Sequence, residues 1–249
     1  MKLSVVIPMY NEESIVADTI SVLDASLERH FGADEYEMIF VSDGSKDKCL
    51  DIASSMKDKY KALKVLGYEV NKGKGCAVRT GMLEAQGDFV LFTDCDLAYG
   101  TDIIKVFYDK YAEKGSDIVI GSRALNGGGY DGYSFLRKAM SMVYLRIVGI
   151  VAGFKLSDSQ CGIKGFANGY ASRIFSLCQA DGFEFDLEAL MIGESFGCSF
   201  AEIPVKIINH RESKVNPIKD SVKMLRQIRN IKKRHKQRLK DGTLKETSL

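Results

Sequence analysis

Residues 88–96 read Asp-Phe-Val-Leu-Phe-Thr-Asp-Cys-Asp. The apolar side chains in the first part of this stretch are typical of a strand buried on both faces of a parallel sheet. Two carboxylates follow directly, at Asp94 and Asp96. Side chains two residues apart at a strand end project to the same side, so both carboxylates can converge on one hard cation. The stretch predicts a buried strand with a divalent metal site at its carboxyl end. A solvated turn or a helix cap is the alternative.

The chain before this stretch repeats the same plan. Short apolar runs predict further strands, and the segments between them have the length and pattern of helices, which is the signature of βαβ units on a parallel sheet. The strands are predicted at 3–8, 36–41 and 63–68, with one more at 117–121 after the quoted stretch. The helices are predicted from Asn11, as the N-cap, to about His30, and over 47–60 and 73–85.

After residue 121 the rhythm changes. A glycine-rich loop at 126–130 precedes an apolar helix over about 134–153 and a polar turn at 157–162. A helix is then predicted over about 183–197, a strand over 199–207 and a basic helix over 219–240. We find no internal repeat and no low-complexity segment.

Composition excludes several classes of protein. The 249 residues are 45% hydrophobic and 27% charged, as in an ordinary globular protein and unlike a disordered or collagen-like chain. The six cysteines include no Cys-x-x-Cys pair and His is scarce, so we expect neither a zinc site nor a disulfide framework. No run of about 18 apolar residues predicts a membrane span, and the first residues do not resemble a signal peptide. We therefore expect the chain to stay in the cytosol.

The charge is unevenly distributed. Residues 211–240 hold twelve Lys or Arg and two acids, so this segment is +10 while the remainder of the chain is −8. Within it, Val222, Leu225, Ile228 and Ile231 recur every three residues, which predicts a basic amphipathic helix suited to an anionic surface. The alternative is a helix whose apolar stripe docks on the body. Nucleic acid is a poor partner, because residues 219–240 contain no aromatic side chain for stacking on bases.

Four polar clusters follow successive predicted strands, at 8–12, 42–45, 71–75 and 94–96. Ligands of open α/β sheets bind beyond the carboxyl ends of the strands, so these clusters predict one composite nucleotide site. In the third cluster, backbone N–H groups of Gly73-Lys74-Gly75 could approach an anion at a helix start. Asp43 could accept a hydrogen bond from a base or form a local turn, and Tyr10 could stack on a base or pack on the adjacent helix.

The motifs at the strand ends resemble those of a known protein family. The patterns Ile-Pro-x-Tyr-Asn-Glu, Asp-Gly-Ser-x-Asp, Lys-Gly-x-Ala-x-Arg-x-Gly and Thr-Asp-x-Asp-Leu resemble those of a family 2 glycosyltransferase with a GT-A fold. Downstream, Gly121-Ser122-Arg123, the run from Asp158 to Lys164, Phe185-Asp-Leu-Glu188 and Ser213-Lys214-Val215 resemble the polyprenyl-phosphate branch, and most of all its dolichyl-phosphate glucosyltransferases. The resemblance implies a GT-A domain over 1–217, Rossmann-like, with a mostly parallel sheet flanked by helices, followed by a basic amphipathic helix and tail over 218–249.

The resemblance also implies roles for individual residues. The nucleotide sugar would be bound by Pro8, Tyr10, Asn11, Glu12, Asp43, Lys74, Arg79 and Asp94. Asp94 and Asp96 would bind Mg²⁺ or Mn²⁺ together with the diphosphate. Arg123 and Gln160 would line the sugar and acceptor pocket beside a catalytic Asp158. Arg211 and Lys214 would meet the acceptor phosphate.

Three positions depart from the family pattern. Ser42 replaces the first acid of an Asp-Asp-Gly-Ser motif, and Ala98 replaces a Gln typical of the mannosyltransferase branch, which makes that branch less fitting. The segment around Arg211 is compressed, which leaves its alignment open.

The resemblance implies inverting transfer of a sugar, with UDP-glucose the favoured donor, to a polyprenyl phosphate at the cytoplasmic face of a membrane. The basic helix, the apolar helix over 139–153 or a membrane partner would supply the membrane contact. The alternative is a soluble family 2 transferase acting on a glycan hydroxyl, for which Asp158 would be the general base. A nucleotide-binding module without catalysis and a nucleotidyltransferase are weaker alternatives.

Overall fold

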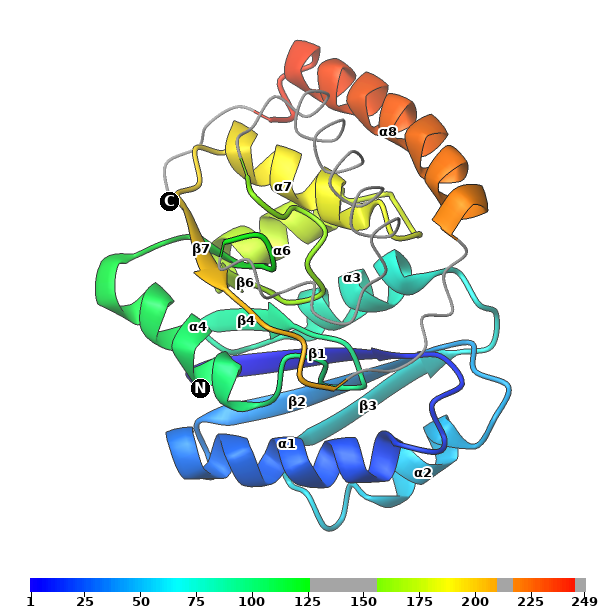
Figure 1. Cartoon of the computed structure of the whole chain (residues 1–249), viewed down its shortest axis with the longest axis vertical. Helices are drawn as coiled ribbons and strands as arrows, with labels where there is room; N and C mark the ends of the chain where they lie inside the picture. The colour runs from blue at the N-terminus through cyan, green and yellow to red at the C-terminus, as the bar shows by residue number, and fades with distance from the viewer. Residues whose placement is uncertain (126–155, 210–216, 245–249) are drawn as a thin grey trace.

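Seven strands of the described chain form one sheet in the order β3-β2-β1-β4-β6-β5-β7. The computed structural model describes residues 1–125, 156–209 and 217–244 (Figure 1). The strands are β1 (Leu3–Met9), β2 (Tyr36–Asp43), β3 (Leu63–Tyr68), β4 (Phe89–Phe92), β5 (Ile118–Ser122), β6 (Lys164–Ala167) and β7 (Phe200–Pro204). The helices are α1 (Val16–Phe31), α2 (Cys49–Ser55), α3 (Lys74–Glu84), α4 (Asp102–Lys114), α6 (Asn168–Leu177), α7 (Phe185–Ser195) and α8 (Pro217–Lys240).

One strand runs against the others. β1 pairs in parallel with β2 and β4, β2 with β3, and β5 with β7, whereas β6 is antiparallel to both β4 and β5. The carboxyl ends of the parallel strands therefore share one edge of the sheet with the beginning of β6. Consequently the residues that precede β6, at 156–163, lie beside those that follow β4.

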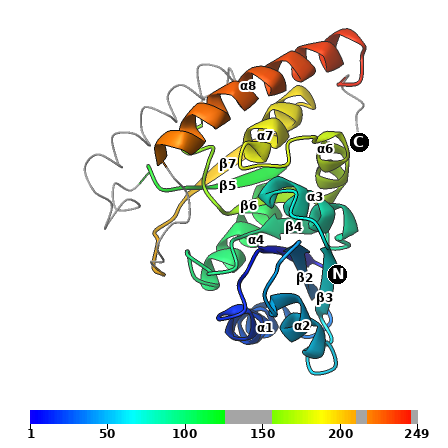
Figure 2. The same cartoon turned by 90° about the vertical axis from the view of Figure 1, so that its right-hand side faces the viewer.

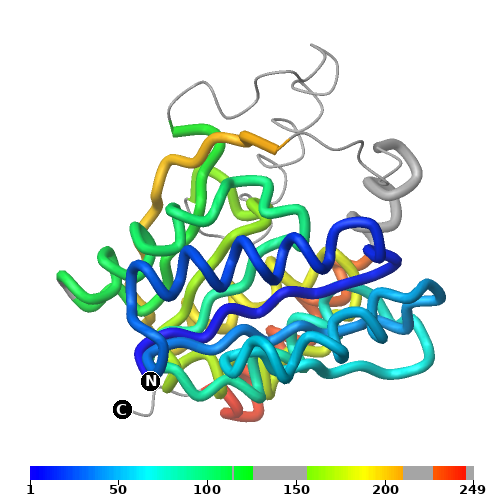
Figure 3. Tube along the Cα trace, turned by 90° about the horizontal axis from the view of Figure 1, so that it is seen from below, coloured from blue at the N-terminus to red at the C-terminus, as the bar shows by residue number. Residues whose placement is uncertain are grey.

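The helices cover both faces of the sheet. Successive strand residues point to opposite faces, and their apolar side chains enter two separate clusters. One cluster joins the sheet to α3, α6, α7 and α8 and includes Val6, Ile39, Val41 and Phe92. The other joins it to α1, α2 and α4 and includes Val5, Ile7, Phe40 and Leu91. Figures 1 and 2 show the two helical layers, and Figure 3 shows α1 covering the sheet from below.

The last helix packs on the body by its apolar side. Ile228 and Ile231 are 2% and 1% exposed in the cluster shared with α7. Glu188 of α7, also buried, accepts hydrogen bonds from Arg234 and from Arg238 at 3.0 Å. The docked alternative is therefore correct for this part of the stripe, so the amphipathic helix does not present Ile228 and Ile231 to an outside surface. Among the described helices, none combines the length and hydropathy needed to cross a bilayer.

Most predicted elements are confirmed, with shifted bounds. The N-cap prediction at Asn11 is wrong: α1 begins at Val16, and Asn11 adopts a φ of 54° while its side-chain oxygen accepts the Lys46 N–H at 2.8 Å. The elements α4, β6 and α6 are not among those predicted from the sequence. The predicted helix over 134–153 lies outside the described residues.

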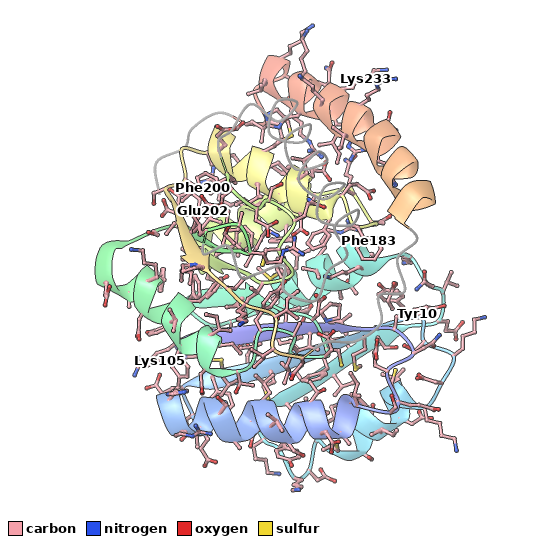
Figure 4. The ribbon with its side chains drawn as sticks, viewed as in Figure 1. Tyr10, Lys105, Phe183, Phe200, Glu202 and Lys233 are labelled. Atoms are coloured by element: carbon pink, nitrogen blue, oxygen red, sulfur yellow. The ribbon has the colours of Figure 1, made fainter. Side chains whose placement is uncertain are left out.

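Replacing the buried Ile228 tests whether α8 belongs to the folded body. We expect Ile228→Ala to lower the free energy of unfolding by about 2–5 kcal/mol, because it leaves a cavity against α7. Urea denaturation followed by circular dichroism measures this change. The exposed Lys233, which points outward on the same helix (Figure 4), is the control, and Lys233→Ala should cost less than about 0.5 kcal/mol. Equal stabilities of the two variants would mean that α8 unfolds separately.

Candidate active site

The two carboxylates that follow β4 lie where three segments meet. The Asp94 Oδ1 atom is 2.5 Å from Nζ of Lys74, the first residue of α3. On its other side Asp94 contacts the loop before β6, where a Cβ on Gly162 would lie 2.3 Å from Asp94 Oδ2. The prediction that the 71–75 and 94–96 clusters come together is confirmed by these contacts.

The turn after Asp94 is held by several hydrogen bonds. The Asp94 carbonyl accepts the Leu97 N–H at 3.0 Å, and Asp96 Oδ1 accepts the Ala98 N–H at 3.1 Å. Leu97 adopts a φ of 47°, a left-handed conformation that costs about 1–2 kcal/mol in a residue with a side chain. The Asn209 amide donates to the Leu97 carbonyl at 3.0 Å. These contacts fix the backbone that presents both carboxylates.

The residues at this turn fit a divalent cation that is shared with a substrate. The Asp94 carboxylate already binds one cationic group, the Lys74 ammonium. No cluster of three or more His, Cys, Asp or Glu side chains suited to a metal occurs in the described part of the chain. Mg²⁺ and similar ions are commonly held by one or two carboxylates plus substrate phosphates, which matches a site of two aspartates.

A second lysine–aspartate pair, Lys164 with Asp186, lies close to the first. Nζ of Lys164 donates to Asp186 Oδ1 at 2.8 Å and to the Cys161 carbonyl at 2.6 Å. Burial raises the pKa of Asp186, although the Lys164 and Lys74 ammonium groups oppose the shift. Burial disfavours the charge of Lys74, but the carboxylates of Asp94 and Asp186 outweigh it and raise the pKa of Lys74. Both Lys164 and Asp186 stand in motifs of the sequence, but their pairing was not anticipated.

Asp43 organises the loop that leads into α3. Its buried carboxylate accepts hydrogen bonds from the Tyr68 hydroxyl at 2.7 Å, the Asn71 amide at 2.9 Å and the Lys72 N–H at 2.9 Å. The Gly73 N–H also donates to it, at 2.9 Å. A carboxylate has about four lone-pair sites, so the donors of the protein account for its accepting capacity. These donors lie 25 to 30 residues further along the chain, so they do not form the local turn that was the alternative for Asp43, and its contact with a base stays a prediction.

The start of α3 is occupied by protein rather than open to an anion. The Asp181 carbonyl accepts the Gly75 N–H at 2.8 Å and the Cys76 N–H at 3.3 Å. A Cβ on Gly73 would lie 2.3 Å from this same carbonyl, so the glycine there permits close packing of two loops. The prediction that backbone N–H groups of this turn cradle a phosphate is wrong for this arrangement. Arg79 likewise pairs with Asp181, at 2.7 Å.

Asp158 and Arg123 form a buried bidentate pair. The Arg123 guanidinium donates to the two Asp158 oxygens at 2.6 and 2.9 Å, and the Asp158 side chain is 0% exposed. Burial opposes the charge of Arg123, but its bond to Asp158 raises the pKa of Arg123 well above the ordinary value. The Gln160 N–H donates to Asp158 at 3.3 Å. The three residues predicted as catalytic therefore lie together, with the carboxylate bound to the guanidinium.

The loop before β6 is fixed along its length. The Glu202 carboxylate of β7 accepts the Ser157 N–H at 2.8 Å, and the Tyr99 hydroxyl accepts the Gly162 N–H at 3.2 Å. Together with the Lys164 bond to Cys161, these contacts hold the loop against Asp94.

The loop after β1 lies at the same edge of the sheet. Pro8 and Met9 are the last residues of β1 that pair with β2, and Tyr10 follows, 41% exposed (Figure 4). Asn11 and Glu12 lie between Tyr10 and α1, and Asn11 ties this loop to the one after β2. The exposed ring of Tyr10 stays a predicted stacking surface for a base. Arg211 and Lys214 lie outside the described residues.

A pocket of about 460 Å³ adjoins this edge (its volume is of the size that holds small ligands). It opens between the loop before α3, the loop 179–184 and α8. Lys72, Lys74, Asp181, Phe183, Asn230 and Arg234 are among its lining residues. The pocket therefore places α8 next to the lysine that contacts Asp94.

Known proteins resemble this chain in sequence and in fold. A sequence profile described as glycosyl transferase family 2 matches residues 4–175. The dolichyl-phosphate beta-glucosyltransferase of Drosophila melanogaster is 33% identical over 239 residues, which cover 92% of this chain and 73% of that protein.

Solved structures confirm the predicted GT-A fold. The glucosyl-3-phosphoglycerate synthase of Mycobacterium tuberculosis, in complex with Mn²⁺, UDP-glucose and phosphoglyceric acid, matches with a TM-score of 0.64 and 18% identity, covering 94% of this chain and 79% of that one. TarS of S. aureus matches with a TM-score of 0.55 and 23% identity over 82% of this chain, which spans 58% of the TarS chain.

Breaking the buried Asp158–Arg123 pair tests how much it contributes to the stability of the fold. We expect Asp158→Asn to lower the free energy of unfolding by about 3–5 kcal/mol, because it removes the buried carboxylate charge that accepts both guanidinium hydrogen bonds of Arg123. The matched control is Asp109→Asn, which breaks a pair with Lys105 at 2.6 Å whose side chains are 34% and 44% exposed, and it should cost about 0–1 kcal/mol. Urea denaturation of both variants gives the comparison. Wild-type stability of Asp158→Asn would contradict the assignment of this pair as a structural anchor.

Proposed function

Because this chain belongs to glycosyl transferase family 2, we propose that it transfers glucose from UDP-glucose to a polyprenyl phosphate. The dolichyl-phosphate glucosyltransferase of Drosophila supports this donor and acceptor, since it is similar over nearly the whole chain. The UDP-glucose in the synthase of the same fold also suits the donor.

The observation that favours a phosphate acceptor is the pairing of the Asp158 carboxylate with Arg123. A hydroxyl acceptor requires a general base, and the carboxylate predicted for that role accepts two hydrogen bonds from Arg123. A phosphomonoester has a second pKa of about 6 and is mostly ionised at neutral pH. Such an acceptor needs no base. The Asp158–Arg123 pair would then hold the acceptor side of the site rather than remove a proton.

The reaction would be a displacement with inversion at the anomeric carbon. An oxygen of the acceptor phosphate forms the new bond to this carbon, while the bond from the carbon to the diphosphate breaks. The electron pair of the broken bond leaves with UDP. Tyr10 would stack on the base, and Asp94 and Asp96 would hold Mg²⁺ or Mn²⁺ with the diphosphate. When bound, this cation would neutralise the negative charge of the leaving diphosphate.

A lipid acceptor requires contact with a membrane surface. The buried Ile228 and Ile231 turn the opposite, charged side of α8 outward, where Arg229, Lys232, Lys233, Lys236 and Lys240 are exposed. We infer peripheral binding of this side to anionic headgroups at the cytoplasmic face. The contact would be electrostatic, without insertion of the apolar stripe.

A transfer assay tests the proposed reaction. The full chain is incubated with Mn²⁺ or Mg²⁺, UDP- and GDP-sugars and a short-chain polyprenyl phosphate, and the lipid product is identified by mass spectrometry. We expect a hexosyl-phosphate lipid from UDP-glucose, and a fall in kcat/KM of roughly hundredfold or more in Asp94→Asn, because a bound cation supplies several kcal/mol. The exposed Asp51→Asn is the control. Sugar transfer to a glycan hydroxyl without lipid product would refute the proposed acceptor.

Charge reversal on α8 tests the membrane contact. We expect the triple change Lys232→Glu, Lys233→Glu and Lys236→Glu to weaken binding to vesicles containing phosphatidylglycerol by at least roughly tenfold, at about 1 kcal/mol per basic residue near the surface. The control reverses three exposed lysines on the far side of the sheet, at 57, 59 and 61. Co-sedimentation at two salt concentrations gives both affinities. Equal losses in the two triples would contradict a role of α8.

A further inference from the structure

Two lysine–aspartate pairs lie close together at the proposed donor site, and the exposure of their side chains differs. Lys164 and Asp186 are sealed, with side chains 1% and 8% exposed. Lys74 and Asp94 are partly exposed, at 19% and 37%. The Lys164 ammonium also binds the Cys161 carbonyl, so the sealed pair belongs to the fold. For the Lys74 ammonium, the described contacts include no second bond to the backbone, so it can change partners without breaking one.

The backbone beneath Lys74 is fixed while its side chain is long. Asp43 holds the Gly73 N–H and Asp181 holds the Gly75 N–H, one residue on either side. Only the four-carbon stem of Lys74 can therefore move. Its ammonium occupies an oxygen of the carboxylate predicted to bind the metal.

From this geometry we propose that Lys74 is a built-in cation that neutralises Asp94 until metal and donor bind together, and then turns to the donor diphosphate. This inference rests on the proposed donor site. A divalent ion on Asp94 would meet the positive charge of Lys74 at short range, so the metal alone binds weakly. The diphosphate of the donor gives Lys74 another anionic partner and releases Asp94 to the metal. Metal and nucleotide therefore strengthen each other's binding by the same factor.

Binding of Mn²⁺ in the absence of sugar transfer tests the proposal. The electron paramagnetic resonance signal of free Mn²⁺ is titrated against the full chain, with and without UDP. We expect Lys74→Met to bind Mn²⁺ without UDP about tenfold more tightly than the wild type, within the roughly 5- to 150-fold range of coupled sites. UDP should tighten Mn²⁺ binding strongly in the wild type and much less in Lys74→Met.

Three further variants isolate the cause. Lys74→Arg keeps the positive charge and should bind Mn²⁺ as the wild type does. Lys72→Met removes a neighbouring lysine whose Nζ lies 5.0 Å from the ring centroid of Tyr68, and should also leave Mn²⁺ binding unchanged. Adding Asp94→Asn to Lys74→Met should abolish the gain. Lys74→Gln serves as a second neutral variant, and thermal melting checks that each variant is folded.

The Mn²⁺ titrations distinguish a failure of the Lys74 proposal from a failure of the proposed donor site. If folded Lys74→Met and Lys74→Gln bind Mn²⁺ without UDP no better than the wild type, the role of Lys74 is refuted while the donor site stands. If UDP does not tighten Mn²⁺ binding even in the wild type, both the coupling and the proposed donor site are refuted.

Discussion

A carboxylate removed from water must be met by donors of the protein, and this requirement fixes the loops of the structure. Asp43 gathers the N–H groups of the loop before α3, and Asp158 binds the Arg123 guanidinium. Glu188 accepts the Gln179 and Ala180 N–H groups at 2.8 and 2.6 Å and also binds α8. Each of these acids has at least one donor from a segment distant in the sequence, such as Arg238 for Glu188. The buried acids thus determine where the strand-end loops lie, and with them the position of Asp94.

The local patterns of the sequence predicted what depends on near neighbours. Apolar runs located β1 to β5, and the polar clusters after them indicated the correct edge of the sheet. Sequence patterns do not predict β6, because its four residues, Lys-Gly-Phe-Ala, include a lysine whose burial depends on Asp186 and on the Cys161 carbonyl. The caps and glycines were misread for the same reason: the partners of Asn11 and Gly73 lie on other loops, at Lys46 and Asp181.

The candidate site divides its acids into two groups that the sequence does not distinguish. Asp43 and Asp158 fit the family pattern as well as Asp94 does, but they are buried and hydrogen-bonded to the protein. Of these three acids, Asp94 has the exposed carboxylate: its side chain is 37% exposed. Its charge is neutralised by Lys74, a long side chain with four rotatable bonds. Which acid builds the fold and which meets a ligand is decided by burial, and burial depends on tertiary contacts.

Glu188 has a consequence for the lipid that such an enzyme could use. One of its oxygens binds α8, and the other holds the loop whose Asp181 carbonyl packs on the start of α3. Hydrogen bonds through Glu188 thus connect α8 with the loop that packs on the start of α3, where Lys74 lies. These contacts would set the height of Asp94 above any surface on which α8 rested. A headgroup would have to rise that height to be glycosylated, while its hydrocarbon tail stayed in the bilayer. The enzyme would then recognise the phosphate and the first carbons of the lipid, and polyprenyl phosphates of different chain lengths would be equally good acceptors.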